Sequence, residues 1–122
     1  LGHDVTICLN GHTLSCDTNL FTISGTLTIC DCVGTGVVES AYKGEAGLIY
    51  MLISYGTADL GAEINLYGGT FRNTDNDGSA KSGVIQAGNS GSNPGTLNLW
   101  NATIEGGTGT YGGNLYIQQD SV

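Results

Sequence analysis

A short sequence phrase recurs four times along the chain, and this recurrence restricts the folds that the chain can adopt. The clearest copies are INLYGGTF, which begins at Ile64, and LNLWNATI, which begins at Leu97. Looser copies begin at Val5 and Leu27, so that successive copies start 22, 37 and 33 residues apart. Internal repeats of this length are typical of solenoids, in which each unit is stable only when it packs on its neighbours.

Apolar and polar residues alternate with a period of two inside each copy, which is the spacing of a β-strand. No segment shows the i, i+3, i+4, i+7 apolar recurrence of an amphipathic helix, so we predict essentially no helix. The apolar columns predicted to point inward are Val5/Leu27/Ile64/Leu97, Ile7/Ile29/Leu66/Leu99 and Ile23/Ile49/Ile85/Leu115. Copies stacked in register predict an all-β fold, a parallel β-helix (a solenoid) of about four coils with strands about 4.8 Å apart.

The repeated runs resemble a known family. VTICLNGHTL and GTLTICDCVGTG, followed by INLYGGTF and LNLWNATIEGG, resemble right-handed parallel β-helix repeats of the pectate-lyase-like superfamily. They look most like repeats in large secreted or surface-anchored proteins of Gram-positive gut bacteria. The resemblance covers nearly the whole chain, and it implies a fold rather than an activity, because the superfamily includes lyases, hydrolases, adhesins and glycan-binding segments. Since the chain begins at Leu1 without a signal segment, we expect residues 1–122 to be one β-helix segment of a longer repeat protein.

The charge of the chain argues against two kinds of partner. Three basic residues (Lys43, Arg72 and Lys81) face eleven acidic ones, which gives a formal net charge of −8. Contact with a phosphate backbone needs clustered Lys and Arg, so we expect no nucleic-acid partner. The chain also lacks an apolar run of the roughly 18 residues needed to span a bilayer, so we expect no membrane insertion.

All four cysteines, at positions 8, 16, 30 and 32, fall in the first two copies of the repeat. Three disulfide pairings are open to them. Cys8 and Cys30 align in adjacent coils, at a spacing within disulfide range, so Cys8–Cys30 with Cys16–Cys32 is the favoured set. Disulfides would indicate an oxidising compartment, in agreement with an extracellular or cell-surface location. The alternative is a zinc site completed by His3 or His12, although the cysteine spacings differ from the usual zinc pairs.

An Asx-rich loop is the candidate metal site. Asn73, Asp75 and Asp77 alternate before Gly78, as oxygen ligands do in short Ca²⁺ loops. Val84 stands where the closing bidentate Glu would be, and a plain Asx-rich turn is the alternative reading. No other cofactor is expected.

The same loop carries the alternative in which the chain is part of an enzyme. Asn73-Thr74-Asp75 is similar to the tripeptide of polygalacturonase-like hydrolases, but the other elements of that pattern are missing. The alternative function is therefore a fragment of a polysaccharide lyase or glycoside hydrolase centred on Asp75 and Asp77. A lyase would also need a basic residue, and a salt bridge is the expected role of Arg72.

Outward-pointing aromatic residues form the candidate binding surface. Tyr67 and Trp100 occupy equivalent places in successive coils, and Tyr50 and Tyr116 flank a similar column. Aromatic rings beside polar side chains can hold sugar rings. The predicted glycan-contact residues are Tyr67, Trp100, Tyr50, Tyr116, Asn65 and Asn98. The alternative is that the rings form an intramolecular ladder that stabilises the stack.

The ends of the predicted stack suggest a further role. Nothing near Leu1 or Val122 looks like a capping helix, so each end leaves unpaired backbone groups. Further coils or other copies of the chain would cover these ends, and stacking of copies gives a filament. We therefore expect a non-enzymatic structural or interaction module that acts in adhesion, glycan contact or self-assembly. Its expected partners are a glycan and neighbouring coils or copies of itself.

Overall fold

The computed structural model describes residues 3–41, 47–51, 54–55, 58–59, 61–74, 83–87 and 95–117. These residues form strands and turns, and no helix occurs among them. Accordingly, the described residues include no helix long and apolar enough to cross a membrane.

Parallel pairing organises the strands into three four-stranded sheets. Sheet A contains, in spatial order, β1 (Val5–Cys8), β4 (Thr26–Cys30), β9 (Glu63–Tyr67) and β12 (Thr96–Trp100). Sheet B contains β2 (Thr13–Cys16), β5 (Val37–Ser40), β10 (Thr70–Asn73) and β13 (Thr103–Glu105). Sheet C contains β3 (Phe21–Ile23), β6 (Ile49–Met51), β11 (Ile85–Ala87) and β14 (Leu115–Ile117). A short antiparallel pair, β7 (Ser54–Tyr55) and β8 (Ala58–Asp59), stands apart from them.

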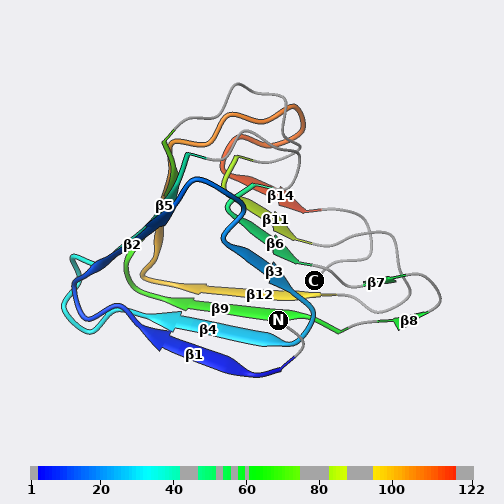
Figure 1. The fold of residues 1–122 in the computed structure, drawn as a ribbon, viewed down its shortest axis with the longest axis horizontal. Coiled ribbons are helices and arrows are strands. Elements are labelled where there is room, and N and C mark those ends of the chain that lie inside the picture. Colours follow the sequence, from blue (N-terminus) through cyan, green and yellow to red (C-terminus); the bar gives the residue numbers. More distant parts are fainter. Residues whose placement is uncertain are drawn as a thin grey trace.

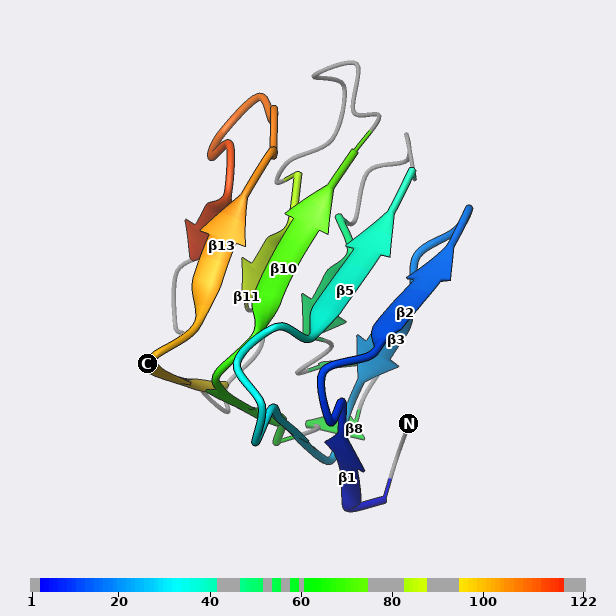
Figure 2. The same ribbon diagram turned by 90° about the vertical axis from the view of Figure 1, so that its left-hand side faces the viewer.

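The chain passes through the three sheets in the same order each time. We call one strand from each sheet a layer, so that β1–β3 form layer 1, β4–β6 layer 2, β9–β11 layer 3 and β12–β14 layer 4. Sheet A lies along the lower side of the view in Figure 1, sheet B on its left and sheet C at the upper right. The strands of sheet B lie side by side and point the same way in Figure 2. Each layer therefore pairs with the layer before it.

The predicted register of sheet A is confirmed. Val5, Leu27, Ile64 and Leu97 are partners on successive strands, and so are the residues two positions later in each copy. In strands, alternate side chains point to opposite faces, so this register puts one apolar face inward along all four strands.

The third predicted column is wrong in its first member. The structure pairs Phe21 with Ile49 and pairs Ile23 with Met51, so that the column runs Phe21/Ile49/Ile85/Leu115. A shift of two residues leaves a strand's side chains on the same face, so alternation alone did not distinguish Phe21 from Ile23. Ile23 is still fully buried.

All three sheets contribute to one apolar core. Its fully buried members in the middle layers include Ile29 and Leu66 of sheet A, Val38 and Phe71 of sheet B and Ile85 of sheet C. Burial of such side chains supplies the main driving force for a fold whose backbone pairings are mostly between distant residues.

Residues with positive φ make the corner between sheets A and B. Asn10 and Gly11 turn the chain in layer 1, Gly68 and Gly69 in layer 3, and Asn101 in layer 4. Gly and Asn tolerate this left-handed backbone better than other residues do. The repeated phrase therefore encodes a strand, a corner and the next strand.

Candidate functional site

Two aromatic rings stand on the outer face of sheet A. Tyr67 and Trp100 are register partners on β9 and β12, and they project away from the face that buries Ile64 and Leu66. Tyr67 is 44% exposed and Trp100 is 75% exposed. Ring stacking is recorded, within the described part of the chain, only between Tyr111 and Tyr116. The two rings of sheet A therefore present aromatic surface to solvent instead of stacking on each other.

A row of polar side chains runs across the same face, beside the rings. The Asn65 amide nitrogen donates hydrogen bonds to Glu63 Oε1 at 2.9 Å and to Thr28 Oγ1 at 3.4 Å. Asn65 Oδ1 accepts from Asn98 Nδ2 at 2.8 Å and from the Tyr67 hydroxyl at 3.4 Å. Asn65 is only 6% exposed, whereas Asn98 is exposed. Asn65 therefore holds Asn98 and Tyr67 in place, and Asn98 is the amide that a ligand can reach.

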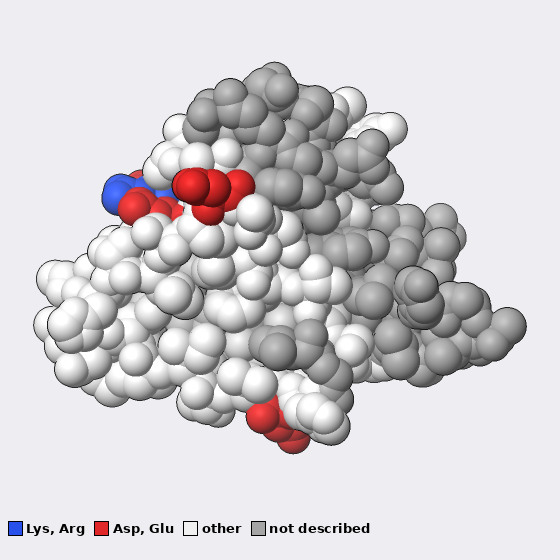
Figure 3. Space-filling view, viewed as in Figure 1, with Lys and Arg blue, Asp and Glu red and all other residues white. Residues whose placement is uncertain are grey.

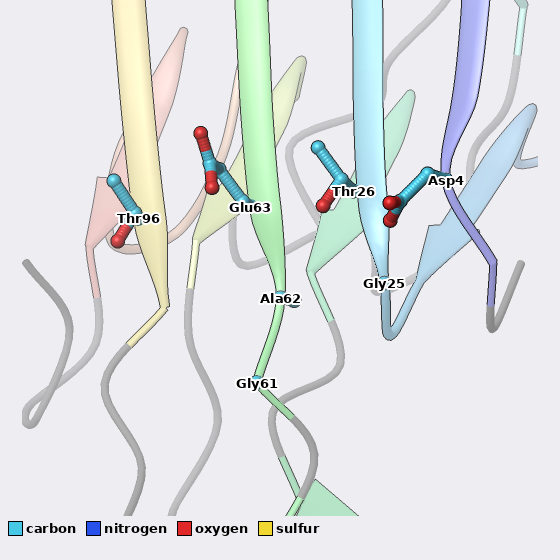
Figure 4. A pocket seen from close by; sticks show the side chains of 7 residues that line it. All are labelled: Asp4, Gly25, Thr26, Gly61, Ala62, Glu63 and Thr96. Carbon is cyan, nitrogen blue, oxygen red and sulfur yellow. The ribbon is translucent and has the colours of Figure 1, made fainter.

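A groove of about 390 Å³ continues this face to the edge where the strands of sheet A begin. Its polar side chains come from Asp4, Thr26, Glu63 and Thr96, and Gly25, Gly61 and Ala62 complete its lining. Thr26, Glu63 and Thr96 are register partners, and Figure 4 shows them in a row across neighbouring strands. Glu63 belongs to both the groove and the amide row, so the two form one continuous surface. No prediction from the sequence covers this groove, although the outward-pointing column Thr26/Glu63/Thr96 would have indicated it.

The structure does not bring all the predicted glycan-contact residues together. Tyr50 and Tyr116 lie in sheet C, where both pair with Gln86. Gln86 is buried, and Tyr116 is half-buried and stacks on Tyr111 with ring centroids 5.4 Å apart. Sheet C lies on a different side of the molecule from sheet A (Figure 1). Of the predicted residues, Tyr67, Trp100, Asn65 and Asn98 do lie together. We name the surface formed by Tyr67, Trp100, Asn98, Glu63 and Thr96 the sheet A platform.

Few charged side chains lie on the described part of the face shown in Figure 3, and its cationic atoms lie beside acidic ones. Arg72 of β10 contacts Glu39 of β5 at 2.7 Å and Glu105 of β13 at 3.7 Å. Its side chain is 40% exposed, and such pairs stabilise little, but they occupy the guanidinium. The expected salt-bridge role of Arg72 is confirmed.

The four cysteines are all free thiols, so the structure does not support the predicted disulfides. Cys8 and Cys30 are register partners as predicted, yet they form no disulfide, and the Cys8 sulfur lies 3.6 Å from that of Cys32. Cys16 lies in sheet B, and its thiol donates to the Thr18 carbonyl at 3.0 Å. A Cys16–Cys32 pair is unsupported, because Cys32 sits in the turn after sheet A and faces Cys8 instead.

The pKa values of the three neighbouring thiols are shifted in different directions. A hydrogen bond from the Cys32 thiol, together with bonds from the Asn10 backbone and the Cys30 thiol, lowers the pKa of Cys8. Partial burial, followed by the contact with Cys8, raises the pKa of Cys30. The hydrogen bond to Cys8 raises the pKa of Cys32. The three thiols therefore influence one another's pKa values.

The candidate calcium loop is only partly described. Asp75 and Asp77 lie outside the described residues, as does any carboxylate pair that they would form. Asn73 is buried, and its amide nitrogen donates to the Gly83 carbonyl at 2.9 Å. This side chain therefore ties the end of β10 to the segment that leads into β11.

Comparisons with known proteins add no further assignment, since no protein-family model, no curated protein and no solved structure matches the chain.

Proposed function

We propose that the three sheets form a right-handed parallel β-helix of four coils, in which each layer is one coil. Three observations support this fold: the strands are parallel, each sheet takes one strand from every layer, and equivalent residues of the repeat pair in register. In such a helix every middle strand has both edges paired, which makes a stiff scaffold.

On this scaffold, the function that the geometry supports best is contact with a polysaccharide. The observation that carries the proposal is the pair of exposed rings, Tyr67 and Trp100, on adjacent strands beside the exposed amide of Asn98. Sugar rings offer apolar C–H faces that pack on aromatic rings and hydroxyl groups that bind amides, carboxylates and Thr hydroxyls. The platform supplies each of these groups.

The extent of the platform suits an extended ligand better than a small one. From the Thr96 column to the Trp100 column is four residues, or about 13 Å along the strands. The rings lie at one end and the groove at the other, with the amide row between them. A chain molecule lying along the strands would contact all three, which gives room for a short oligosaccharide segment.

The proposal describes a non-enzymatic module of a secreted or cell-surface protein. Among the described residues, the carboxylates on this surface are Asp4, which lines the groove, and Glu63 of the platform, and Glu63 is held by hydrogen bonds from Asn65 and Asn98. A carboxylate engaged in this way orients binding groups. The alternative, a fragment of a polysaccharide lyase or hydrolase, rests on Asp75 and Asp77.

The test is binding of the reduced chain to an array of extracellular polysaccharides and oligosaccharides, with product release measured in the same wells. We expect the Tyr67→Ala/Trp100→Ala double variant to bind at least about tenfold more weakly. Tyr111→Ala is the matched control, because this Tyr is 68% exposed but lies beside sheet C. Equal loss in both variants, or no loss in the double variant, would overturn the proposal. Product release that disappears in Asp75→Asn would favour the enzyme.

A second candidate function is end-to-end self-assembly. It is favoured by the exposure of apolar side chains on layer 4 that would otherwise face the core. Leu99 is 42% exposed, while its register partner Leu66 is fully buried. Strands β12, β13 and β14 each pair on one side only in the described part of the chain. Layer 1 has the same half-open character, since Val5, Ile7 and Leu14 are partly buried. A second copy stacked head to tail would cover both ends and extend the sheets.

Sedimentation velocity tests this assembly. We expect the chain to form species larger than a monomer as its concentration rises, and Leu99→Lys to shift the distribution toward monomer. The control is Val33→Lys, which places the same charge on an exposed residue of the corner between sheets A and B. A monomer at all concentrations would exclude self-assembly.

A further inference from the structure

Three thiols converge at the corner where sheet A turns toward sheet B. Cys8 ends β1, Cys30 ends β4 directly beside it, and Cys32 follows two residues later in the turn. Their Sγ atoms all lie within 4.8 Å of one another, and Cys8 and Cys32 are 3.6 Å apart. We call these three residues the thiol cluster.

The spacing of the sulfurs matches that of thiolates around a metal ion. Zinc binds thiolate sulfur at about 2.3 Å with tetrahedral angles, which places two bound sulfurs about 3.8 Å apart. The Cys8–Cys32 distance is already close to this value, and small rotations of the side chains would bring Cys30 to it. Soft thiolate ligands of this kind select zinc or copper(I) over the hard cations that carboxylates prefer.

The backbone around the thiol cluster is fixed before any ion binds. Asp31 lies between Cys30 and Cys32 in the sequence. Its carboxylate accepts hydrogen bonds from the Gly11 amide at 2.8 Å and the Gly36 amide at 2.6 Å. The Leu9 amide donates to the Cys30 carbonyl at 2.8 Å, and the Asp31 amide donates to the Tyr67 carbonyl at 3.0 Å. These bonds join layers 1, 2 and 3 at this corner. A preorganised ligand set loses less conformational entropy on binding.

We propose that Cys8, Cys30 and Cys32 bind one Zn²⁺ ion through three thiolates, with the fourth coordination position open to water. Binding replaces the thiol protons, including the one that Cys30 donates to the Ile7 carbonyl at 3.6 Å. Cys8 and Cys32 are exposed, so the ion can reach the cluster from solvent. The Asp31 carboxylate is engaged by backbone amides, and Cys16 lies in sheet B, so neither supplies the fourth ligand.

The proposed site adjoins the sheet A platform but uses different residues. Cys30 of layer 2 is the register partner of Tyr67 of layer 3, so the two sites are neighbours on one face. No residue of the thiol cluster belongs to the platform, so each site can be altered without substituting a residue of the other. A bound ion would also cross-link β1 to β4 at the corner, and it would stabilise layer 1, which pairs on one side only within the described part of the chain.

The experiment is a titration of the fully reduced chain with Zn²⁺ alone, in competition with a chromophoric chelator. Thiol counting before the titration establishes that all four cysteines are free. We expect one ion per chain, and at least about tenfold weaker binding in each of Cys8→Ser, Cys30→Ser and Cys32→Ser. Cys16→Ser is the matched control and should bind as the unaltered chain does. Co²⁺ in place of Zn²⁺ should give the intense thiolate charge-transfer absorption that a tetrahedral sulfur site produces.

Three results would overturn the proposal. The first is no Zn²⁺ binding by a chain whose four thiols are all titratable. The second is binding that depends on Cys16 to the same extent as on Cys32. The third is binding that survives all three serine substitutions, which would place the ion elsewhere. Circular dichroism of each variant without metal separates loss of the site from loss of the fold.

Discussion

Asp31 links the thiol cluster to the turns around it, and it does so through charge. Hydrogen bonds from the backbone amides of Gly36 and then Gly11 lower the pKa of this carboxyl. A carboxyl whose pKa is lower in the folded state stabilises the fold above its unfolded pKa of about 3.9, and this contribution is lost as the pH falls through the folded value.

We therefore expect Asp31→Asn to lower the melting temperature at pH 7, because the Asn amide group would face the Gly36 N–H donor to donor. As the pH falls below about 4, the variant should also lose less stability than the unaltered chain does. Thermal melts recorded as a function of pH test both effects. An unchanged melting temperature with an unchanged acid dependence would mean that the Asp31 bonds contribute nothing.

Gly36 shows how tightly the same corner is packed. A Cβ at this position would lie 2.7 Å from the Leu9 Cβ and 2.8 Å from the Asp31 Cγ. Gly36→Ala should therefore destabilise the fold by about 1–3 kcal/mol, the usual cost of overpacking. Gly61→Ala is the control, since nothing lies within 4 Å of the added atom and its φ is not positive. Equal denaturation midpoints for the two variants would contradict this packing.

At the scale of the strand, two register partners have different surroundings. Leu66 of β9 is fully buried between layers 2 and 4, whereas Leu99 of β12 has, among the described residues, a neighbouring layer on one side only. Leu66→Ala should cost about 2–5 kcal/mol of unfolding free energy, because it leaves a closed cavity. Leu99→Ala should cost about 1 kcal/mol, since less apolar area returns to water. Urea denaturation measures both, and equal losses would mean that the end layer is covered in solution.

The strands were also the part of the fold that could be predicted best. Repeated phrases predicted the pairing of Ile64 with Leu27 and with Leu97, because side-chain alternation and stacking give the same answer there. The register of sheet C could be predicted less well, because its strands are three residues long and a shift of two residues leaves the same side chains facing inward.

The repeated phrases do not predict every residue of the binding face or of the thiol cluster. Trp100 and Tyr67 were recognised from their column, whereas Tyr116 stacks on Tyr111, which is not part of the repeat. The Cys30–Val37 segment is longer than the Cys8–Thr13 segment that makes the same corner in layer 1, so nothing in the pattern indicated that it returns Cys32 to Cys8. Non-repeating turns are set by local hydrogen bonds, such as those to Asp31, and these bonds are not visible in a sequence.

At the scale of the whole molecule, net charge and apolar ends act in opposite directions. Each chain carries a formal charge of −8, so two copies repel each other, while the exposed apolar residues of layer 4 favour contact. Raising the ionic strength from about 0.01 M to about 0.15 M shortens the Debye length from about 30 Å to about 8 Å. Self-association should therefore increase with salt, as sedimentation velocity would show. Dissociation by salt would mean that ion pairs, not apolar ends, hold the copies together.

Because equivalent residues of the layers pair in register, a deletion in the gene could remove one whole layer. Ile64 and Leu97 occupy the same place on adjacent strands, and Glu63 pairs with Thr26 on the preceding one. Joining Glu63 directly to Leu97 would delete one turn of the stack and leave Leu97 opposite Leu27, where Ile64 had been. A gene that lost or gained one repeat in this register would therefore encode a shorter or longer stack with the same kind of contact between neighbouring strands.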